Sequence, residues 1–256
     1  MVMADNKIVV EIKNLSKAFG DHVVLDNISL QVEDGENLVV FGRSGTGKSV
    51  LLKCMIRLLE ADNGRVFIHN KDVIDLSFNE LNELRKDIGF LFQGAALYDS
   101  MSVKENLEFP LIRHFDFTQK ELDEKVNNIL HRVQLEEAKN KMPSELSGGM
   151  KKRIGLARAV ISEPKLMLYD EPTTGLDPIT SKEISKLILE LQKELKMTSV
   201  IVTHDLLCAE IIADRAIMLE KGKIQFEGTI DDMIKSKDNF LKNFFSHEII
   251  ESNNNA

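Results

Sequence analysis

The stretch "NLVVFGRSGTGKS", from Asn37 to Ser49, joins a short apolar run to a glycine-rich segment. The apolar run ends at Gly42 and predicts a buried strand, and the pattern from Lys48 to about Leu59 predicts a helix. The segment between them matches G-x-x-x-x-G-K-S/T in the strand–turn–helix context that a phosphate-binding loop needs. We therefore expect an α/β fold that binds a nucleotide at this turn.

The residues of this loop indicate how the nucleotide would be held. Its glycines let backbone N–H groups approach phosphate oxygens, and the helix start adds partial positive charge. Lys48 is expected to reach the β- and γ-phosphates, and the Ser49 hydroxyl to bind Mg²⁺. A glycine-rich turn without a ligand is the weaker alternative, because the segment directly follows a buried strand. The predicted nucleotide contacts are Gly42, Arg43, Ser44, Gly45, Thr46, Gly47, Lys48, Ser49 and Val50.

A second apolar strand, in "KLMLYDEP" (Lys165–Pro172), ends in two carboxylates. If this strand is a neighbour of the one before the loop, Asp170 would lie near the phosphates and could hold Mg²⁺, usually through water. Glu171 follows at once and is suited to polarising an attacking water. The alternative is a strand-end cap with solvated charges.

Two further runs, "TSVIVTHD" and "FLFQ", end in polar side chains, His204 and Gln93. The carboxyl edge of an open α/β sheet is where ligands collect, so both residues are candidates for the same site. We expect His204 to contact the γ-phosphate and the Gln93 amide to reach the metal and the water. A surface or core position without such a role is the alternative for each.

Strands and helices alternate along most of the chain, which predicts a mainly parallel sheet covered by helices, with "RVFIH" and "IGFLF" among its strands. "KIVVEIKNL" and "HVVLDNISLQV" alternate strictly and predict an antiparallel edge, and "RAIMLEKGKIQFEG" predicts a hairpin around Lys221 and Gly222. The middle of the chain is almost wholly helical and predicts an inserted helical subdomain. We assign one domain, 1–256, with its α/β core in 1–93 and 162–236, the helical subdomain in 94–161, and a C-terminal helix and tail in 237–256.

The end of the chain carries an apolar stripe at helical spacing, formed by Phe240, Leu241, Phe244 and Phe245. We expect a helix packed on its own domain, with a partner site as the alternative. The two cysteines, Cys54 and Cys208, have no metal or redox spacing and are expected to be buried free thiols.

The composition is that of an ordinary globular protein: 256 residues, 43% hydrophobic and 29% charged. A formal net charge of −8 argues against a nucleic-acid partner. No apolar run approaches the length of a membrane span, and the first residues lack the features of a signal peptide. These features favour a cytoplasmic protein.

The stretch "PSELSGGMKKRIGLARAV" (Pro143–Val160) opens a predicted helix with a serine and two glycines. Such a start leaves backbone N–H groups exposed, which makes it a potential anion site. Three cationic residues follow, and we expect at least two of them to lie on a solvated face: Lys151, Lys152 and Arg153.

The phosphate loop, Gln93, "LSGGM", "DEP", "TGLD" and His204 occur in that order, and the set resembles the nucleotide-binding domain of ABC transporters across nearly the whole chain. The resemblance implies an ATPase in which Glu171 is the general base and His204 senses the γ-phosphate. It implies that Gln93 links the metal to a transmembrane partner, and that Phe19 of "KAFG" stacks on adenine. A core-facing strand position is the alternative for Phe19.

The same resemblance implies a head-to-tail homodimer with ATP between the protomers. Ser147, Gly148 and Gly149 would then contact the γ-phosphate held by the other protomer, and Asp177 of "TGLDP" would lie at the dimer seam. The common form of the signature is LSGGQ, so Met150 is a departure. It removes a side-chain amide and leaves the backbone donors.

A closer resemblance is carried by "FQGAALYDSMSVKENLEFPL" (Phe92–Leu111) and "MPSELSGGMKKRIGLARA" (Met142–Ala159), which look like the ATPase of MCE-type (Mla) phospholipid transporters. It implies ATP and Mg²⁺, an integral-membrane permease, an MCE-domain substrate-binding protein, in some systems a STAS-domain subunit, and a place on the cytoplasmic face of the inner membrane. An amino-acid importer or a lipoprotein-release system is the alternative. A soluble ATPase acting on DNA or ribosomes is disfavoured, because the chain has one cassette and no coiled-coil or cysteine-rich insert.

Overall fold

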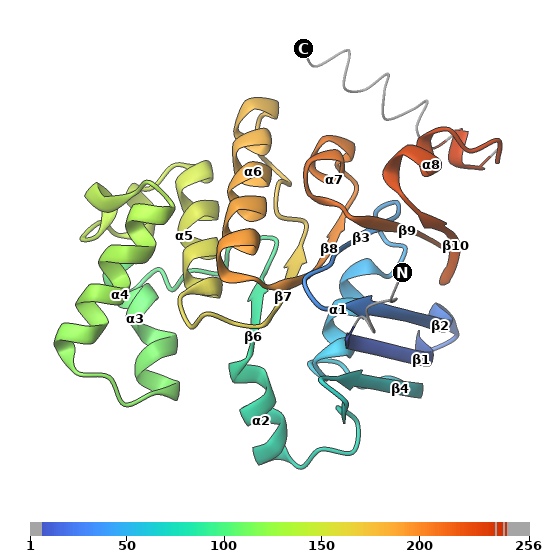
Figure 1. The fold of residues 1–256 in the computed structure, drawn as a ribbon, viewed down its shortest axis with the longest axis horizontal. Coiled ribbons are helices and arrows are strands. Elements are labelled where there is room, and N and C mark those ends of the chain that lie inside the picture. Colours follow the sequence, from blue (N-terminus) through green and yellow to red (C-terminus); the bar gives the residue numbers. More distant parts are fainter. Residues whose placement is uncertain (1–6, 239, 243, 245–256) are drawn as a thin grey trace, which may run out of the picture.

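The computed structural model describes residues 7–238, 240–242 and 244, which form two β-sheets with helices around them (Figure 1). The larger sheet has the strand order β10-β9-β3-β8-β7-β6, and the smaller sheet has the order β2-β1-β4-β5. The strands of the larger sheet are β3 (Asn37–Phe41), β6 (Ile88–Leu91), β7 (Leu166–Asp170), β8 (Thr198–Thr203), β9 (Arg215–Glu220) and β10 (Lys223–Gly228). Those of the smaller sheet are β1 (Ile8–Phe19), β2 (His22–Glu33), β4 (Asn63–Ile68) and β5 (Lys71–Asp72).

The larger sheet is parallel except for β10, which confirms the predicted α/β class. Every residue of β3, β7 and β8 is buried, as expected for strands covered on both faces. Alternate residues of β3 enter two cores, Val39 and Phe41 on one face and Leu38 and Val40 on the other. The predicted hairpin at Lys221 and Gly222 joins β9 to β10.

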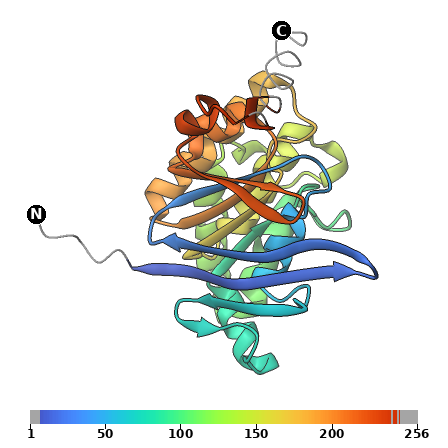
Figure 2. The same ribbon diagram turned by 90° about the vertical axis from the view of Figure 1, so that its right-hand side faces the viewer.

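The smaller sheet, turned toward the viewer in Figure 2, contains the predicted antiparallel edge, which is the pair β1 and β2. The assignment of "RVFIH" to the parallel sheet is wrong: it lies in β4, which pairs antiparallel with β1 (Val10 opposite Ile68). Only alternate residues near the end of β4 are buried, so one of its faces meets solvent, as antiparallel sheets allow.

Helices cover both faces of the larger sheet, and one group stands apart beside β6 (Figure 1). This group is the predicted helical insertion, and it consists of α3 (Val103–His114), α4 (Gln119–Arg132) and α5 (Gly148–Val160), with short 3-10 turns at Glu136–Ala138 and Pro143–Glu145. The other helices are α1 (Lys48–Met55), α2 (Phe78–Lys86), α6 (Pro178–Leu195), α7 (Leu206–Ile212) and α8 (Ile230–Ile234). Ser102 and Thr118 begin α3 and α4 with complete capping boxes.

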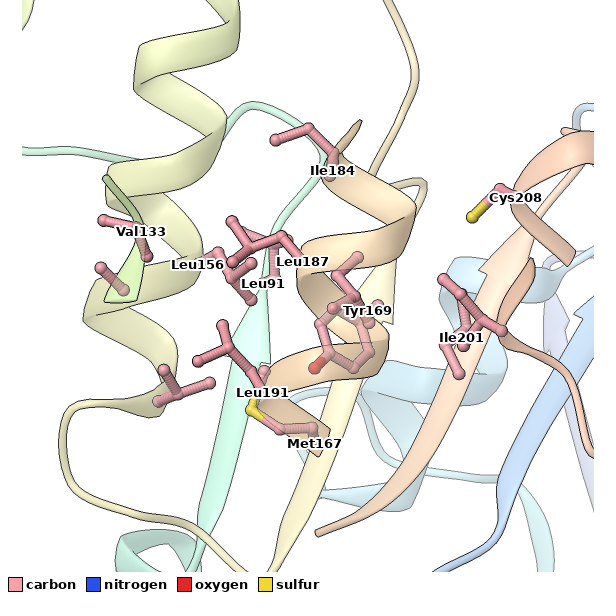
Figure 3. Close-up of a cluster of buried hydrophobic side chains, with 14 of the residues drawn as sticks. Leu91, Val133, Leu156, Met167, Tyr169, Ile184, Leu187, Leu191, Ile201 and Cys208 are labelled. Carbon is pink, nitrogen blue, oxygen red and sulfur yellow. The ribbon is translucent and has the colours of Figure 1, made fainter. Parts of the chain in front are cut away.

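One apolar core joins the helical group to the sheet. Figure 3 shows Leu156 of α5 and Leu187 of α6 pointing toward Leu91 and Tyr169 of the sheet. Because protein cores are close-packed, this shared core ties the position of α5 to the ends of β6 and β7.

The helix that starts at Lys48 ends at Met55, and the expected extension to Leu59 is wrong. Arg57 has a left-handed backbone with φ 51°, and its guanidinium donates to the carbonyls of Val73, Ile74 and Leu76. These hydrogen bonds stabilise the left-handed backbone of Arg57, which an α-helix does not allow, so the helix ends before this residue.

The predicted C-terminal stripe packs on its own domain where the structure describes it. Leu241 and Phe244 are buried in the core, and the Phe244 ring meets the Phe41 ring edge-on. Phe245 and the predicted tail lie outside the described residues. In the described part of the chain, no helix is both long and apolar enough to span a membrane.

The two cysteines are buried free thiols, as predicted. Burial raises the pKa of the Cys54 thiol to about 11 and that of the Cys208 thiol to about 12, so both stay protonated at neutral pH.

Candidate active site

The loop that joins β3 to α1 packs so tightly against its neighbours that two of its positions need glycine. A Cβ on Gly42 would lie 2.5 Å from the Leu219 carbonyl oxygen, and one on Gly47 would lie 2.8 Å from Val24 Cγ1. Gly47 also has φ 99° and begins α1 without a side-chain cap, so the first N–H groups of the helix have no such partner. The predicted contacts divide into exposed residues (Arg43, Ser44, Gly45), half-buried residues (Thr46, Ser49, Val50) and buried residues (Gly42, Gly47, Lys48).

Lys48 places a buried positive charge between this loop and a carboxylate. Its side chain is only 5% exposed, and its Nζ donates to the carbonyls of Gly42 at 2.7 Å and Arg43 at 3.1 Å. The same Nζ lies 3.2 Å from Glu171 Oε1. A phosphate bound in the loop would therefore meet a cation that is already held in place.

Asp170 and Ser49 meet although their strands are not neighbours. Asp170 was expected near the phosphate loop if its strand, β7, were next to β3, the strand before the loop. This condition is not met, because β8 lies between β3 and β7. Ser49 Oγ nevertheless donates to Asp170 Oδ1 at 2.6 Å, because the start of α1 reaches across the end of β8. A hydroxyl and a carboxylate oxygen at this spacing fit the oxygen ligands that Mg²⁺ prefers.

Glu171 is the most contacted carboxylate of the site. Its Oε2 lies 2.9 Å from His204 Nδ1 and accepts a hydrogen bond from Thr174 Oγ1 at 3.2 Å. Burial alone would raise the pKa of Glu171, but the His204 hydrogen bond and the Lys48 charge outweigh it and bring the pKa below its ordinary value. The carboxylate is thus ionised at neutral pH, and because it can only accept, His204 Nδ1 carries the hydrogen.

The backbone at Glu171 is unusual for a residue with a side chain. Its φ is 51°, in the left-handed region, a conformation that costs about 1–3 kcal/mol and persists only where the surroundings enforce it. The Glu171 N–H donates to the Val202 carbonyl at 3.0 Å, and the Glu171 carbonyl accepts from Lys152 Nζ at 3.2 Å. This geometry is typical of functional sites.

Gln93 lies exposed just beyond β6, and its backbone is tied to the helical group. Its carbonyl accepts a hydrogen bond from Lys152 Nζ at 2.5 Å. This role of Lys152, which is 7% exposed, was not predicted from the sequence. Lys151 and Arg153 are partly exposed, as expected for two of the three cationic residues. Helical spacing could have indicated that Lys152 is buried, since it falls on the same helix face as the small residues Gly155 and Ala159.

Phe19 is half exposed at the tip of β1, so the core-facing alternative is wrong. Lys17 Nζ stands 5.5 Å from the ring centroid. The hairpin that carries Phe19 also carries Val24, the neighbour of Gly47, so this hairpin borders the phosphate loop.

The signature segment and Asp177 lie together in a second place, an open groove of about 420 Å³. Ser147 begins α5 by accepting a hydrogen bond from the Met150 N–H, and Asp177 begins α6 by accepting from the N–H groups of Ile179 and Thr180. Within the described residues, no hydrogen bond or ion pair joins this groove to the phosphate loop. The predicted site residues thus form two separate groups. Lining the groove are Ser147, Gly148, Gly149, Met150, Arg153, Gly175, Leu176, Asp177, Thr180 and Glu183.

Gly148 and Gly149 differ in what surrounds them. A Cβ on Gly149 would lie 2.9 Å from Thr180 Cγ2, whereas one on Gly148 would have only Leu176 Cδ2 nearby, at 3.9 Å. The chain itself therefore needs a small residue at 149 but leaves 148 open.

The sequence profile of the family described as ABC transporter matches residues 25–174, more than half of the chain. The chain belongs to the ABC transporter family. Members of this family hydrolyse ATP, so this ABC protein is an ATPase that powers a transporter.

Known relatives agree with this assignment. The chain is 41% identical over 240 residues to the methionine import ATP-binding protein MetN of Clostridium tetani, covering 94% of the chain and 75% of the relative. It is 39% identical over 243 residues to the intermembrane phospholipid transport system ATP-binding protein MlaF of Haemophilus influenzae, covering 95% and 92%. The solved dimeric structure of the ATP-binding cassette MJ0796, bound to ADP and Pi, is 34% identical with a TM-score of 0.79, covering 86% and 98%.

Proposed function

We propose that this ABC ATPase hydrolyses MgATP with the network of Lys48, Ser49, Asp170, Glu171 and His204. The observation that carries the proposal is the contact of Lys48 and His204 with the same Glu171 carboxylate, at 3.2 and 2.9 Å. Three strands bring these side chains to one sheet edge, where the ligands of such sheets bind. The bound nucleotide would lie along the phosphate loop.

Each residue then has a defined task. Glu171, ionised and held by His204, accepts the proton of the attacking water, and Lys48 stabilises the negative charge on the transferred phosphoryl group. His204 contacts the γ-phosphate, and Phe19 stacks on adenine. Ser49, Asp170 and Gln93 would hold Mg²⁺, which neutralises phosphate charge when bound.

The groove at the start of α5 would complete the site of a second protomer. Ser147, Gly148 and Gly149 present the start of α5, a helix terminus that suits an anion. Among the residues that the structure describes, no hydrogen bond or ion pair ties them to the phosphate loop of their own chain. We place them on the γ-phosphate held by the partner of a homodimer, with Asp177 at the seam. MJ0796, a relative in both sequence and fold, is dimeric in its solved structure, which supports this arrangement.

Mixing two inactive variants tests the shared site. Ser147→Ala is expected to lose hydrolysis while keeping ATP affinity, and Lys48→Ala is expected to lose both. A mixture forms heterodimers with one intact composite site, so turnover should recover to about a quarter of wild type for random pairing. Steady-state phosphate release measures it. A mixture as inactive as its two components would refute the shared site.

The transported substrate is the finer question, and we propose phospholipid in an MCE-type (Mla) system. Support comes from the segment Phe92–Leu111 and from the 39% identity to MlaF. The structure describes this segment as a loop that exposes Tyr98, followed by α3, with Ile112 exposed one position beyond the segment. Exposed apolar side chains such as Tyr98 and Ile112, on the segment that follows Gln93 and on α3, suit contact with an integral-membrane permease. An MCE-domain protein, and in some systems a STAS-domain subunit, would complete the assembly on the cytoplasmic face of the inner membrane.

Amino-acid import is the second candidate, because the identity to MetN is 41%. The two candidates predict different companions for the same ATPase. An importer works with a soluble receptor for its substrate, whereas the lipid system works with an MCE-domain protein and carries bound phospholipid.

Purification of the tagged full chain from detergent-solubilised membranes of its own organism distinguishes them. We expect a permease, an MCE-domain protein and phospholipid, identified by mass spectrometry. Co-purification of a soluble amino-acid receptor without lipid would overturn the phospholipid proposal and leave the ATPase assignment intact.

A further inference from the structure

Helix α5 holds the segment after Gln93 along one face for two turns. Lys152 donates to the Gln93 carbonyl, Gly155 comes so close to Ala95 that a Cβ would lie 2.8 Å from the Ala95 Cβ, and Arg158 donates to the Ala95 carbonyl at 3.3 Å. These three residues are spaced at i, i+3 and i+6, so they share a face. The guanidinium of Arg158 also stands 5.5 Å from the centre of the Tyr98 ring.

The held segment has a backbone that needs support. Ala95 and Ala96 have φ of 60° and 49°, in the left-handed region, which residues with a Cβ seldom adopt. Asn106, fully buried on α3, fixes the next turn by accepting from the Tyr98 N–H at 2.8 Å and donating to the carbonyls of Tyr98 and Met101. The Gln93 segment is therefore attached to the helical group rather than to the sheet alone.

Lys152 is the residue of this face that reaches the catalytic side. Its buried ammonium donates both to the Gln93 carbonyl at 2.5 Å and to the Glu171 carbonyl at 3.2 Å. Glu171 and Gln93 follow different strands, β7 and β6, and each leaves its strand at the edge where the phosphate loop lies. The Lys152 side chain of α5 thus links Glu171, the proposed base, to Gln93, a proposed Mg²⁺ ligand.

We propose that Lys152 is a positioning residue for ATP hydrolysis: it keeps Glu171 and Gln93 of its own chain in one relative placement and ties both to α5. The inference rests on the proposed function, since it assigns Lys152 a task only if Glu171 is the base. The left-handed backbone of Glu171 explains the need, because a strained residue requires a partner to hold it. A base displaced by about 1 Å loses on the order of 10²-fold in rate.

Removing the ammonium while keeping the apolar stem is the direct test. Lys152→Met in the full chain should lower kcat by about 10-fold or more. The KM for MgATP should stay within about twofold, because the phosphate loop is untouched and loss of positioning lowers kcat alone. Lys152→Arg, which keeps a cation with several donors, should retain most of the wild-type kcat.

Lys151→Met is the matched control, because it makes the same change one residue earlier on a partly exposed side chain. Its kcat should stay within about twofold of wild type. A normal kcat in Lys152→Met, or a loss that Lys151→Met shares, would overturn the inference.

Heterodimers distinguish positioning from damage to the helix. In the heterodimer of Ser147→Ala and Lys48→Ala chains, one composite site is intact. It takes its phosphate loop and Glu171 from the Ser147→Ala chain, the first chain, and its signature segment from the Lys48→Ala chain, the second chain. Lys152→Met added to the first chain should lower the recovered turnover by about 10-fold or more, and Lys152→Met added to the second chain should leave it unchanged. Equal loss in both positions, or loss only in the second, would show a structural role of α5 and reject the positioning role.

The same mixtures test the shared site and the positioning role of Lys152 separately. If the mixture without Lys152→Met shows no recovery, the shared site of the proposed function fails, and the kcat of the homodimeric Lys152→Met and Lys152→Arg proteins still decides the role of Lys152. If recovery is seen and Lys152→Met has no effect in either chain, the inference about Lys152 alone is rejected.

Discussion

Replacing Glu171 by glutamine is expected to lower ATP hydrolysis by about 10²–10⁴-fold, the range that general-base catalysis contributes. The amide keeps the size of the carboxylate but cannot take the proton of the attacking water. Because Lys48 and the phosphate loop are unchanged, ATP should still bind. Steady-state phosphate release gives the turnover, and a fluorescent ATP analogue gives the affinity. Retained ATP should also hold the variant as a dimer, seen by size-exclusion chromatography.

The control for this variant is Glu190→Gln, the same change on an exposed position of α6. It should hydrolyse ATP at the wild-type rate. Unchanged turnover in Glu171→Gln would remove Glu171 as the base. Loss of ATP binding in the same variant would instead point to a role in holding the nucleotide.

Lys48→Ala is expected to weaken MgATP binding by about 10- to 100-fold, because hydrogen bonds to charged groups contribute about 1.5–3 kcal/mol each. Hydrolysis should fall below detection, since the side chain also faces the base. Lys48 helps to lower the pKa of Glu171, so its removal should raise that pKa and leave a buried carboxylate with less compensation. Titration with the fluorescent analogue measures the affinity.

Lys53→Ala provides the matched control, since it removes a partly exposed lysine further along the same helix. It should bind ATP as the wild type does. Wild-type affinity in Lys48→Ala would contradict the assignment of the phosphate loop. Equal weakening in both variants would indicate that α1, rather than the lysine charge, is what the substitution disturbs.

The local features of the site could be predicted from the sequence because each depends on a short segment. A strand that ends in glycines, or in Asp170 and Glu171, can be identified from its own period and composition. The structure brings the loop, both carboxylates and His204 into contact, as these segments suggested. Their roles in catalysis remain predictions that the variants above test.

The order of strands could not be predicted in the same way, because it depends on crossovers between distant segments. β8 separates β3 from β7, and β4 joins a different sheet, although each strand was recognisable by itself. The role of Lys152 was missed for a related reason. A lysine in a cationic run is usually solvated, and only the packing of α5 against the Gln93 segment buries this one.

The open surroundings of Gly148 have a consequence for what the glycine serves. Glycine in a helix lowers local stability relative to alanine. Beyond the adjacent residues and the backbone of α5 itself, the nearest described atom to a Cβ on Gly148 would be Leu176 Cδ2, at an ordinary contact distance of 3.9 Å. Folding of the single chain therefore gives no reason for glycine at this position. Any requirement for glycine at position 148 therefore comes from the partner protomer. Stability of the single chain favours alanine at this position, whereas dimer formation favours glycine.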